Sequence, residues 1–144
     1  MRSAASPRRP LPQPDEVSAG YWEAAGNGRL AIQRCACCRR WYHPPVLACP
    51  QCRSRDLAFE PVQGRGTIHQ RIIVHQTKLA GFEASTPYCA VTVELDEQPG
   101  LYVVANLVTC RPDEAEVGQR VQAVFERDDR GTVLPQFAPS EAAS

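Results

Sequence analysis

The sequence predicts a mainly β protein in which a short N-terminal helix and a cysteine-rich ribbon precede a small five-stranded barrel. Two Cys-x-x-Cys pairs lie within residues 35–52, and beyond Gly66 the apolar residues alternate with a period of two. A single short helical pattern occurs near the N-terminus. With 144 residues, 43% of them hydrophobic, the chain is long enough to bury the core of one domain or of two very small ones.

The N-terminal region divides into a tail and a helix. Residues 1–14 hold four of the thirteen prolines and almost no large aliphatic side chains, so we expect a disordered tail. Residues 15–29 form the helical region, because Asp15 is a favoured capping residue, helix formers follow it, and the pattern stops at a Gly-Asn-Gly sequence. This helix carries Tyr21 and Trp22.

The rest of the chain is expected to form the ribbon over residues 30–63, the barrel over residues 64–139, and a short tail over residues 140–144. In the ribbon, one strand precedes the cysteines and another follows them at residues 56–62. The Gly-Arg-Gly sequence at 64–66 precedes a strand rather than a helix, so its glycines are expected to start a bent barrel strand and not to form a phosphate loop.

Five strands are expected in the barrel, over residues 67–77, 88–95, 101–110, 120–127 and 132–139. Alternation places two sets of residues on shared faces: Ile68, Gln70, Ile72 and Val74 in the first strand, and Cys89, Val91, Val93 and Leu95 in the second. Five short strands, with one longer connection between the third and the fourth, match the five-stranded Greek-key barrel of the OB type. Another small barrel or a small sandwich is the alternative.

The strongest motif is the pair of knuckles formed by Cys35-x-x-Cys38 and Cys49-x-x-Cys52. Each knuckle puts two sulfurs on one tight turn, and two facing turns supply four thiolates in the tetrahedral arrangement that suits Zn²⁺. A site closed by four cysteines has no open position for chemistry. We therefore expect a structural ion, which contributes folding energy to a ribbon that has few large apolar side chains.

Three cysteines remain outside these knuckles. Cys37 is interpreted as a spare thiol, and Cys89 and Cys110 are expected to be small core residues within barrel strands. The alternatives to a zinc site are a disulfide scaffold, a redox-active Cys-x-x-Cys, and a rubredoxin-like iron site that uses the same four sulfurs.

The charge pattern argues against tight binding to phosphate backbones. Lysine plus arginine equals aspartate plus glutamate, with sixteen of each, so the chain has no overall positive field. Residues 1–60 carry nine arginines against five acids, and residues 61–144 carry seven basic residues against eleven acids, which gives roughly +4 and −4. The N-terminus lacks the apolar region of a secretory signal, and no run approaches the ~20 apolar residues that span a bilayer. We expect a cytoplasmic protein.

The sequence predicts no catalytic residues. His69 and His75 are placed on the first barrel strand without an obvious nucleophile or acid beside them, and are expected to be solvated or at an edge. His43 lies in the ribbon. The acidic residues cluster in the turns, where they cap and solubilise.

Four stretches of the chain resemble the DUF35 family, in which a rubredoxin-like zinc ribbon is joined to an OB-fold domain. They are YWEAAGNGRL, LAIQRCACCRRWYHPPVLACPQCRSRDLAFEPVQGRGTIHQRIIVH, PYCAVTVELDEQPGLYVVANLV and VGQRVQAVFE. The resemblance implies a small accessory subunit bound to a thiolase-like enzyme, an acyl-CoA hydratase or an aldolase that acts on acyl-CoA thioesters in lipid, sterol or polyketide metabolism. It also implies that the four knuckle cysteines are zinc ligands.

The chain departs from that family at the residue after each knuckle. The family often has glycine there, because a positive φ lets backbone N–H groups point at sulfur. Here these positions are Arg39 and Arg53, which we expect to adopt the same conformation at a cost of about 1 kcal/mol.

A set of aromatic and basic residues is the candidate surface for a partner or for coenzyme A, since Trp, Tyr and Arg are typical interface anchors: Trp22, Arg34, Arg39, Arg40, Trp41 and Tyr42. The alternative role of the aromatics is packing between helix, ribbon and barrel. The alternative functions are single-stranded nucleic-acid binding, and an independent enzyme or electron carrier.

Overall fold

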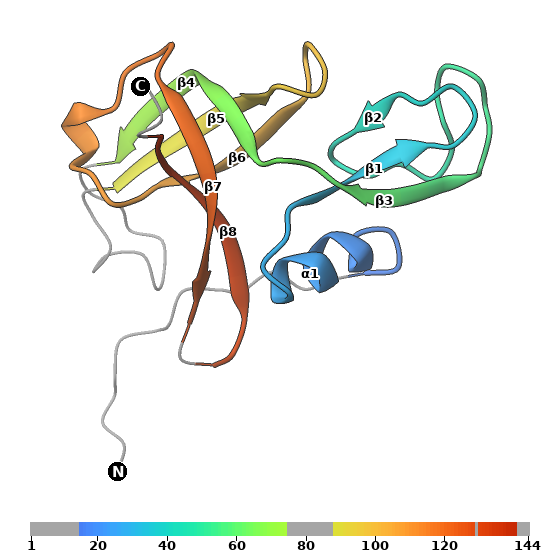
Figure 1. Ribbon diagram of the computed structural model, residues 1–144, viewed down its shortest axis with the longest axis horizontal. Coiled ribbons are helices and arrows are strands. Elements are labelled where there is room, and N and C mark those ends of the chain that lie inside the picture. Colours follow the sequence, from blue (N-terminus) through green and yellow to red (C-terminus); the bar gives the residue numbers. More distant parts are fainter. Residues whose placement is uncertain (1–14, 75–87, 129, 141–144) are drawn as a thin grey trace.

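The computed structural model describes residues 15–74, 88–128 and 130–140, and these contain the expected order of a helix, a ribbon and a barrel (Figure 1). One α-helix is followed by a three-stranded sheet and then by a closed five-stranded barrel. The mainly β fold class is therefore confirmed. The tail expected at residues 1–14 and most of the one expected after residue 139 lie outside the described residues. No helix in the described part of the chain is long and apolar enough to cross a membrane.

Helix α1 (Ala19–Gly26) is shorter than the expected helical region, and its N-cap is Ser18, not Asp15 as predicted. Asp15 instead bonds to Ser18. The Ser18 backbone N–H donates to Asp15 Oδ1 at 2.8 Å, and the Asp15 backbone N–H donates to Ser18 Oγ at 3.1 Å. At the other end Gly28 has φ +74°, and the N–H of the residue after it reaches back to the Ala24 carbonyl at 2.9 Å. This closure needs a left-handed residue, which explains the Gly-Asn-Gly stop.

The ribbon sheet has the strand order β2–β1–β3, with β1 (Ala31–Cys35) in the centre, β2 (Trp41–Tyr42) on one side and β3 (Leu57–Pro61) on the other. Both pairings are antiparallel. β1 and β3 confirm the two strands expected around the cysteines. β2 was not predicted, because a strand of two residues gives no alternation to detect.

The barrel contains the five expected strands: β4 (Arg65–Val74), β5 (Tyr88–Leu95), β6 (Tyr102–Leu107), β7 (Arg120–Arg127) and β8 (Val133–Pro139). Their order around the barrel is β4–β5–β6–β8–β7. All pairings are antiparallel except that of β6 with β8, which is parallel and joins Leu107 to Phe137. This is the OB arrangement. A 3₁₀ turn, η2 (Pro112–Glu114), lies in the long connection between β6 and β7.

The predicted faces are correct for β5 and wrong for β4. In β5 the inward set at residues 89, 91, 93 and 95 is buried throughout. In β4 the register shifts between Ile68 and Gln70, so that His69 is an extra residue. Ile68 is 1% exposed, whereas Ile72 is 65% exposed, because a bulge moves every later side chain to the opposite face.

Gly66 shows why the first barrel strand starts with glycines. A Cβ at this position would lie 2.5 Å from both Val93 Cγ1 and the carbonyl oxygen of Glu94. β4 therefore approaches β5 more closely than any other residue would allow, as expected for a strand that bends into a barrel.

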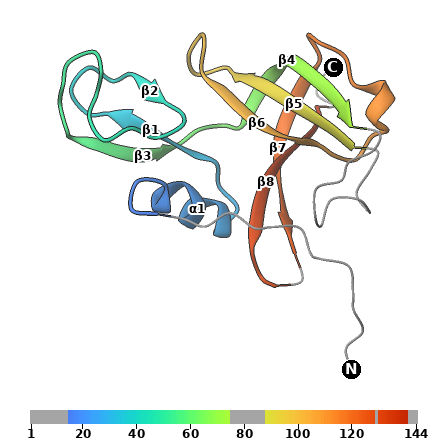
Figure 2. The same cartoon turned by 180° about the vertical axis from the view of Figure 1, so that it is seen from behind.

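The three parts pack around one connected core. α1 lies against β1 and β3 of the ribbon and against β8 of the barrel, as both ribbon views show (Figures 1 and 2). Tyr21, Ile32 and Trp41 belong to the same buried cluster as the barrel residues. The backbone of Trp41 is also held by the side chain of Gln98, in the turn between β5 and β6.

Candidate metal centre

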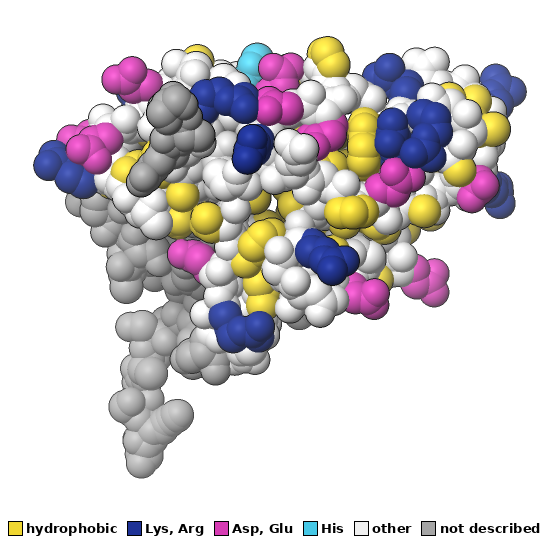
Figure 3. All heavy atoms as spheres, in the orientation of Figure 1, with side chains coloured by type: hydrophobic (Ala, Val, Ile, Leu, Met, Phe, Trp, Pro, Cys, Tyr) yellow, Lys and Arg dark blue, Asp and Glu magenta, His cyan; other side chains and the backbone are white. Residues whose placement is uncertain are grey.

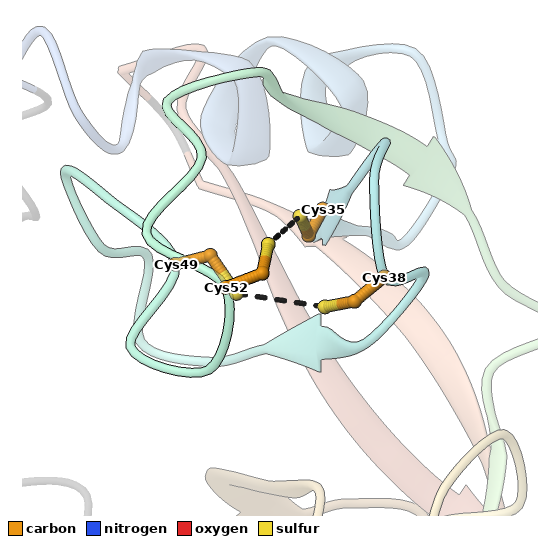
Figure 4. Close-up of side chains that lie close together, drawn as sticks. All are labelled: Cys35, Cys38, Cys49 and Cys52. Carbon is orange, nitrogen blue, oxygen red and sulfur yellow. Dashed lines mark hydrogen bonds between the residues drawn. The ribbon is translucent and has the colours of Figure 1, made fainter.

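Four cysteine sulfurs converge at the end of the ribbon (Figure 4). Cys35 ends β1, Cys38 lies in the turn that follows, and Cys49 and Cys52 lie in the turn before β3. All four Sγ atoms are within 4.8 Å of one another. The shortest separations join one knuckle to the other, at 3.6 Å for Cys35 to Cys52 and 3.5 Å for Cys38 to Cys49.

The two knuckles have the same backbone conformation. In each, the first cysteine accepts a hydrogen bond from the N–H four residues later and donates its own N–H to the carbonyl five residues later, at 2.7 to 2.9 Å. The residue after each knuckle, Arg39 or Arg53, has φ +66°. Both arginines thus occupy the left-handed conformation that was expected where the family often has glycine.

The sulfur geometry fits one tetrahedral metal ion. With metal–sulfur bonds of ~2.3 Å, neighbouring sulfurs of a tetrahedron are ~3.8 Å apart, close to the two shortest separations. Those separations are much longer than the ~2.05 Å of a disulfide, and all seven cysteines are free thiols. The disulfide scaffold is therefore contradicted. Four sulfur ligands fill a tetrahedral coordination shell, so an ion held here is structural and not catalytic.

Tyr42 extends the centre beyond the four ligands, because its hydroxyl lies 3.0 Å from Cys49 Sγ. This hydrogen bond, with a further contribution from burial, raises the pKa of Tyr42 to about 12, so the hydroxyl keeps its proton and donates it to sulfur. Burial disfavours the Cys49 thiolate, but hydrogen bonds from Tyr42 and from the backbone of Cys52 and Gln51 outweigh it and lower the pKa of Cys49 to about 6. Donors of this kind stabilise a thiolate ligand.

The other three cysteines lie outside the cluster. Cys37 is exposed, consistent with a spare thiol. Cys89 is buried in the barrel core on β5. Cys110 is half-buried against that core, but it lies beyond the end of β6 and not within the strand as predicted.

Several of the residues proposed as a partner or coenzyme A surface make contacts within the ribbon. The Arg34 guanidinium lies 4.3 Å from the ring centroid of Trp41 and pairs with Glu60 at 3.4 Å, and Arg39 pairs with the same carboxylate at 3.2 Å. Trp41 is only 7% exposed, which matches the packing alternative for that residue. Tyr42 belongs to the metal centre.

The remaining two candidates lie apart from this stack. Arg40 is exposed and has no ion pair among the described residues. Trp22 is half-buried on α1 and packs edge-on against Tyr21, with ring centroids 4.9 Å apart. Basic side chains gather over the ribbon in the space-filling view (Figure 3).

His43 and His69, the histidines that the structure describes, are not part of the sulfur cluster. His43 stacks on Tyr21 with ring centroids 5.1 Å apart, and its buried Nδ1 has no hydrogen-bond partner among the described residues. Burial lowers the pKa of His43. His69 is exposed at the bulge and contacts Tyr102, and His75 lies outside the described residues.

Sequence reasoning missed two glutamines that hold the ribbon in place. The side-chain amide of Gln33 bonds to both backbone groups of Val46, at 2.7 and 2.9 Å, and so fixes the loop between the knuckles. Gln98 does the same for Trp41, at 3.0 and 3.1 Å. In the sequence, Gln33 stands out only as a polar residue beside Ile32 in a predicted strand, and the structure shows that both are buried. Nothing in the sequence singles out Gln98.

Comparison with known proteins places this ribbon and barrel in a defined class. The family model of the ChsH2 rubredoxin-like zinc ribbon domain matches residues 22–58, and that of the ChsH2 C-terminal OB-fold domain matches residues 59–126. The fold and the site therefore define a zinc-ribbon and OB-fold protein. The chain belongs to the DUF35 family. The boundary between the two matches falls within β3.

Three similar proteins illustrate the family. A "probable enoyl-CoA hydratase alpha subunit" of Thermomonospora curvata is 38% identical over 132 residues, which cover 92% of this chain and 40% of that protein. A "DUF35 domain-containing scaffold protein" of Methanothermobacter thermautotrophicus is 33% identical over 99 residues, 68% of this chain and 72% of the relative. The solved structure of an "Ltp2-ChsH2(DUF35) aldolase" superposes with a TM-score of 0.81 at 37% identity, covering 90% of this chain and 98% of that one. The chain thus spans well under half of the hydratase subunit.

Proposed function

We propose that this chain is a non-catalytic accessory subunit that binds an enzyme acting on acyl-CoA thioesters. The partner is an aldolase, a hydratase or a thiolase-like enzyme of lipid, sterol or polyketide metabolism, in the cytoplasm. The observation that carries the proposal is the similarity to the DUF35 chain of the Ltp2-ChsH2 aldolase structure. The match covers 98% of that chain and 90% of this one. The same ribbon and barrel therefore occur in a protein named as an aldolase and in relatives named as scaffolds.

The side chains of the described residues support a non-catalytic role. The sulfur cluster has no vacant ligand position once it holds an ion. Asp96 forms a two-point ion pair with Arg120, at 2.7 and 2.8 Å, which lowers the pKa of that carboxyl. Asp128 accepts backbone N–H groups of its own turn. These carboxylates are occupied in holding turns and strands together, which leaves them poorly suited to acid–base chemistry.

The metal is proposed to be a structural Zn²⁺ held by Cys35, Cys38, Cys49 and Cys52. Its role is to keep the ribbon folded, because one ion bound by two cysteines from each knuckle joins the two turns to each other. Iron in the same site remains the alternative, and it is distinguished by visible absorption.

The exposed part of the ribbon is proposed to contact the partner or the phosphates of coenzyme A. Arg40 is the best placed of the six candidates, because it is exposed and not neutralised by a carboxylate among the described residues. Single-stranded nucleic-acid binding is less well supported. That mode requires exposed aromatics on the barrel strands, whereas Phe137 is fully buried and Tyr102 is half-buried.

Co-expression tests the proposal. The chain is produced with and without each acyl-CoA enzyme encoded beside its gene, and the solubility, co-purification and activity of the enzyme are measured. We expect one enzyme to co-purify with the chain and to lose solubility or activity without it. If every such enzyme is equally soluble and active alone, the accessory role is wrong.

A further inference from the structure

An open groove lies where α1 meets the outer side of the barrel. It has a volume of about 360 Å³ and is lined by ten residues, among them Tyr21 and Trp22 of α1, Tyr88 of β5, Val104 and Asn106 of β6, and Pro135 of β8. Next to the groove, β6 and β8 pair at Leu107 and Phe137. It is separate from the sulfur cluster.

The chemistry of the groove fits an extended, proline-rich segment. Aromatic rings line it, none of its lining residues is charged, and Val104 is 71% exposed. Trp22 and Asn106 are among the lining residues, and each carries an N–H donor in its side chain. Grooves that bind polyproline II segments combine aromatic walls with such donors, which bond to the exposed carbonyls of the peptide.

The sequence carries a segment of this kind just before the start of the described residues. Residues 7–14 read Pro-Arg-Arg-Pro-Leu-Pro-Gln-Pro, which contains a Pro-x-x-Pro repeat. In a polyproline II helix of three residues per turn, Pro7 and Pro10 lie on the same face, ~9 Å apart. This face is the one that a groove lined with aromatic rings accepts.

We propose that the N-terminal segment, residues 1–14, is the occupant of this groove, with Pro7 to Pro10 seated between α1 and β6. The residues between Pro10 and the helix are long enough to allow this contact. The chain leaves the helix at Asp15, which is bonded to Ser18, and Trp22 lies one helical turn beyond Ser18. Residues 11–14 span ~12 Å in an extended conformation, enough to turn back to the groove.

Charge and connectivity favour this occupant over a foreign segment. Residues 1–14 contain three arginines and no acid. An exposed acid lies beside the groove, because Glu126 accepts a hydrogen bond from the groove residue Gln136 at 3.3 Å. The covalent connection gives the segment an effective concentration in the ~mM range, so even weak contacts keep the groove occupied. An enzyme partner that used the groove would have to displace it.

Proteolysis of the full chain tests the proposal. Trypsin cleaves the Arg8–Arg9 bond but not the bond before Pro10, and release of residues 1–8 is followed by mass spectrometry. The variant Val104→Arg fills the groove and repels the arginines, while Val117→Arg is a matched control at a 63% exposed valine outside the lining. We expect Val104→Arg to accelerate cleavage at least about tenfold, because cleavage follows the population of the undocked segment, and Val117→Arg to leave the rate unchanged. Equal rates in the three proteins would overturn the proposal.

A second measurement on the full chain reports on the groove itself. The ¹H–¹⁵N signal of the Trp22 indole is recorded in the wild type and in a Pro7→Gly, Pro10→Gly variant. A clear shift is expected, and an unchanged signal contradicts docking. In the trypsin assay, protection of the Arg8–Arg9 bond that rises with protein concentration would show that the groove binds the N-terminal segment of a second copy. That result would overturn the intramolecular contact. None of these outcomes depends on the acyl-CoA partner.

Discussion

The side-chain amide of Gln98 pairs with both backbone groups of Trp41, although the two residues are 57 positions apart. Gln98 Oε1 accepts the Trp41 N–H at 3.0 Å, and Gln98 Nε2 donates to the Trp41 carbonyl at 3.1 Å. The turn between β5 and β6 thus takes the place of a neighbouring strand for β2. The ribbon is joined to the barrel here by directional bonds as well as by apolar packing.

Removing this amide should destabilise the whole chain. Gln98→Ala leaves the N–H and C=O of Trp41 without partners, which costs about 1–3 kcal/mol where the groups stay buried. Gln70→Ala, at an exposed glutamine of β4, is the matched control and should change stability by less than about 0.5 kcal/mol. Urea unfolding of the metal-loaded proteins measures both. Equal stability of the two variants would mean that the pairing contributes nothing.

Glycine after the second knuckle should stabilise the protein. Arg53 is exposed, has φ +66° and forms no ion pair among the described residues, so Arg53→Gly removes backbone strain at little other cost. The greater freedom of glycine in the unfolded chain offsets part of this effect, so we expect the free energy of unfolding to rise by about 0.5–1 kcal/mol. Arg55→Gly, where φ is not positive, should destabilise. Thermal unfolding of the zinc-loaded Arg53→Gly and Arg55→Gly variants measures both effects. A less stable Arg53→Gly variant would contradict the claim that the backbone is strained at Arg53.

Acidification should weaken the contact between ribbon and helix at His43. Burial against Tyr21 lowers the pKa of His43, so the unfolded chain binds a proton at pH values where the folded chain does not. This contribution to stability is complete above the unfolded pKa of ~6.5 and is lost progressively as the pH falls towards the lowered folded value. His43→Phe keeps the stacking and should flatten this part of the stability curve, whereas His69→Asn should not. Parallel curves for wild type and His43→Phe would show that the pKa of His43 is the same in the folded and unfolded states, which contradicts this prediction.

Much of the fold follows from local sequence patterns. β7 has the predicted bounds because its alternation is clean and a glycine and an acidic turn enclose it. The bulge at His69 was not predictable, because the extra residue is imposed by the closure of β4 onto β5 and β7 and not by local preference. The two-residue strand β2 depends on the same kind of distant contact.

The sulfur cluster is the part of the site that spacing predicts best, since two turns of the same length impose the same geometry on their sulfurs. The contacts of the residues around the cluster could not be predicted in the same way. Tyr42 was assigned to a partner surface, but its hydroxyl contacts Cys49. Trp41 and Arg34 stack on each other inside the ribbon, because Glu60 on the neighbouring strand β3 holds the arginine in place. Such pairings form between strands that sequence periodicity cannot align.

The metal content of the purified full chain tests the central claim most directly. Elemental analysis should find one zinc per chain, without the visible absorption of iron, in the wild type and in Cys37→Ser. Cys49→Ser should lose both the zinc and the folded ribbon. A well-folded chain without bound metal, or a Cys49→Ser variant that keeps its zinc and its stability, would contradict the account.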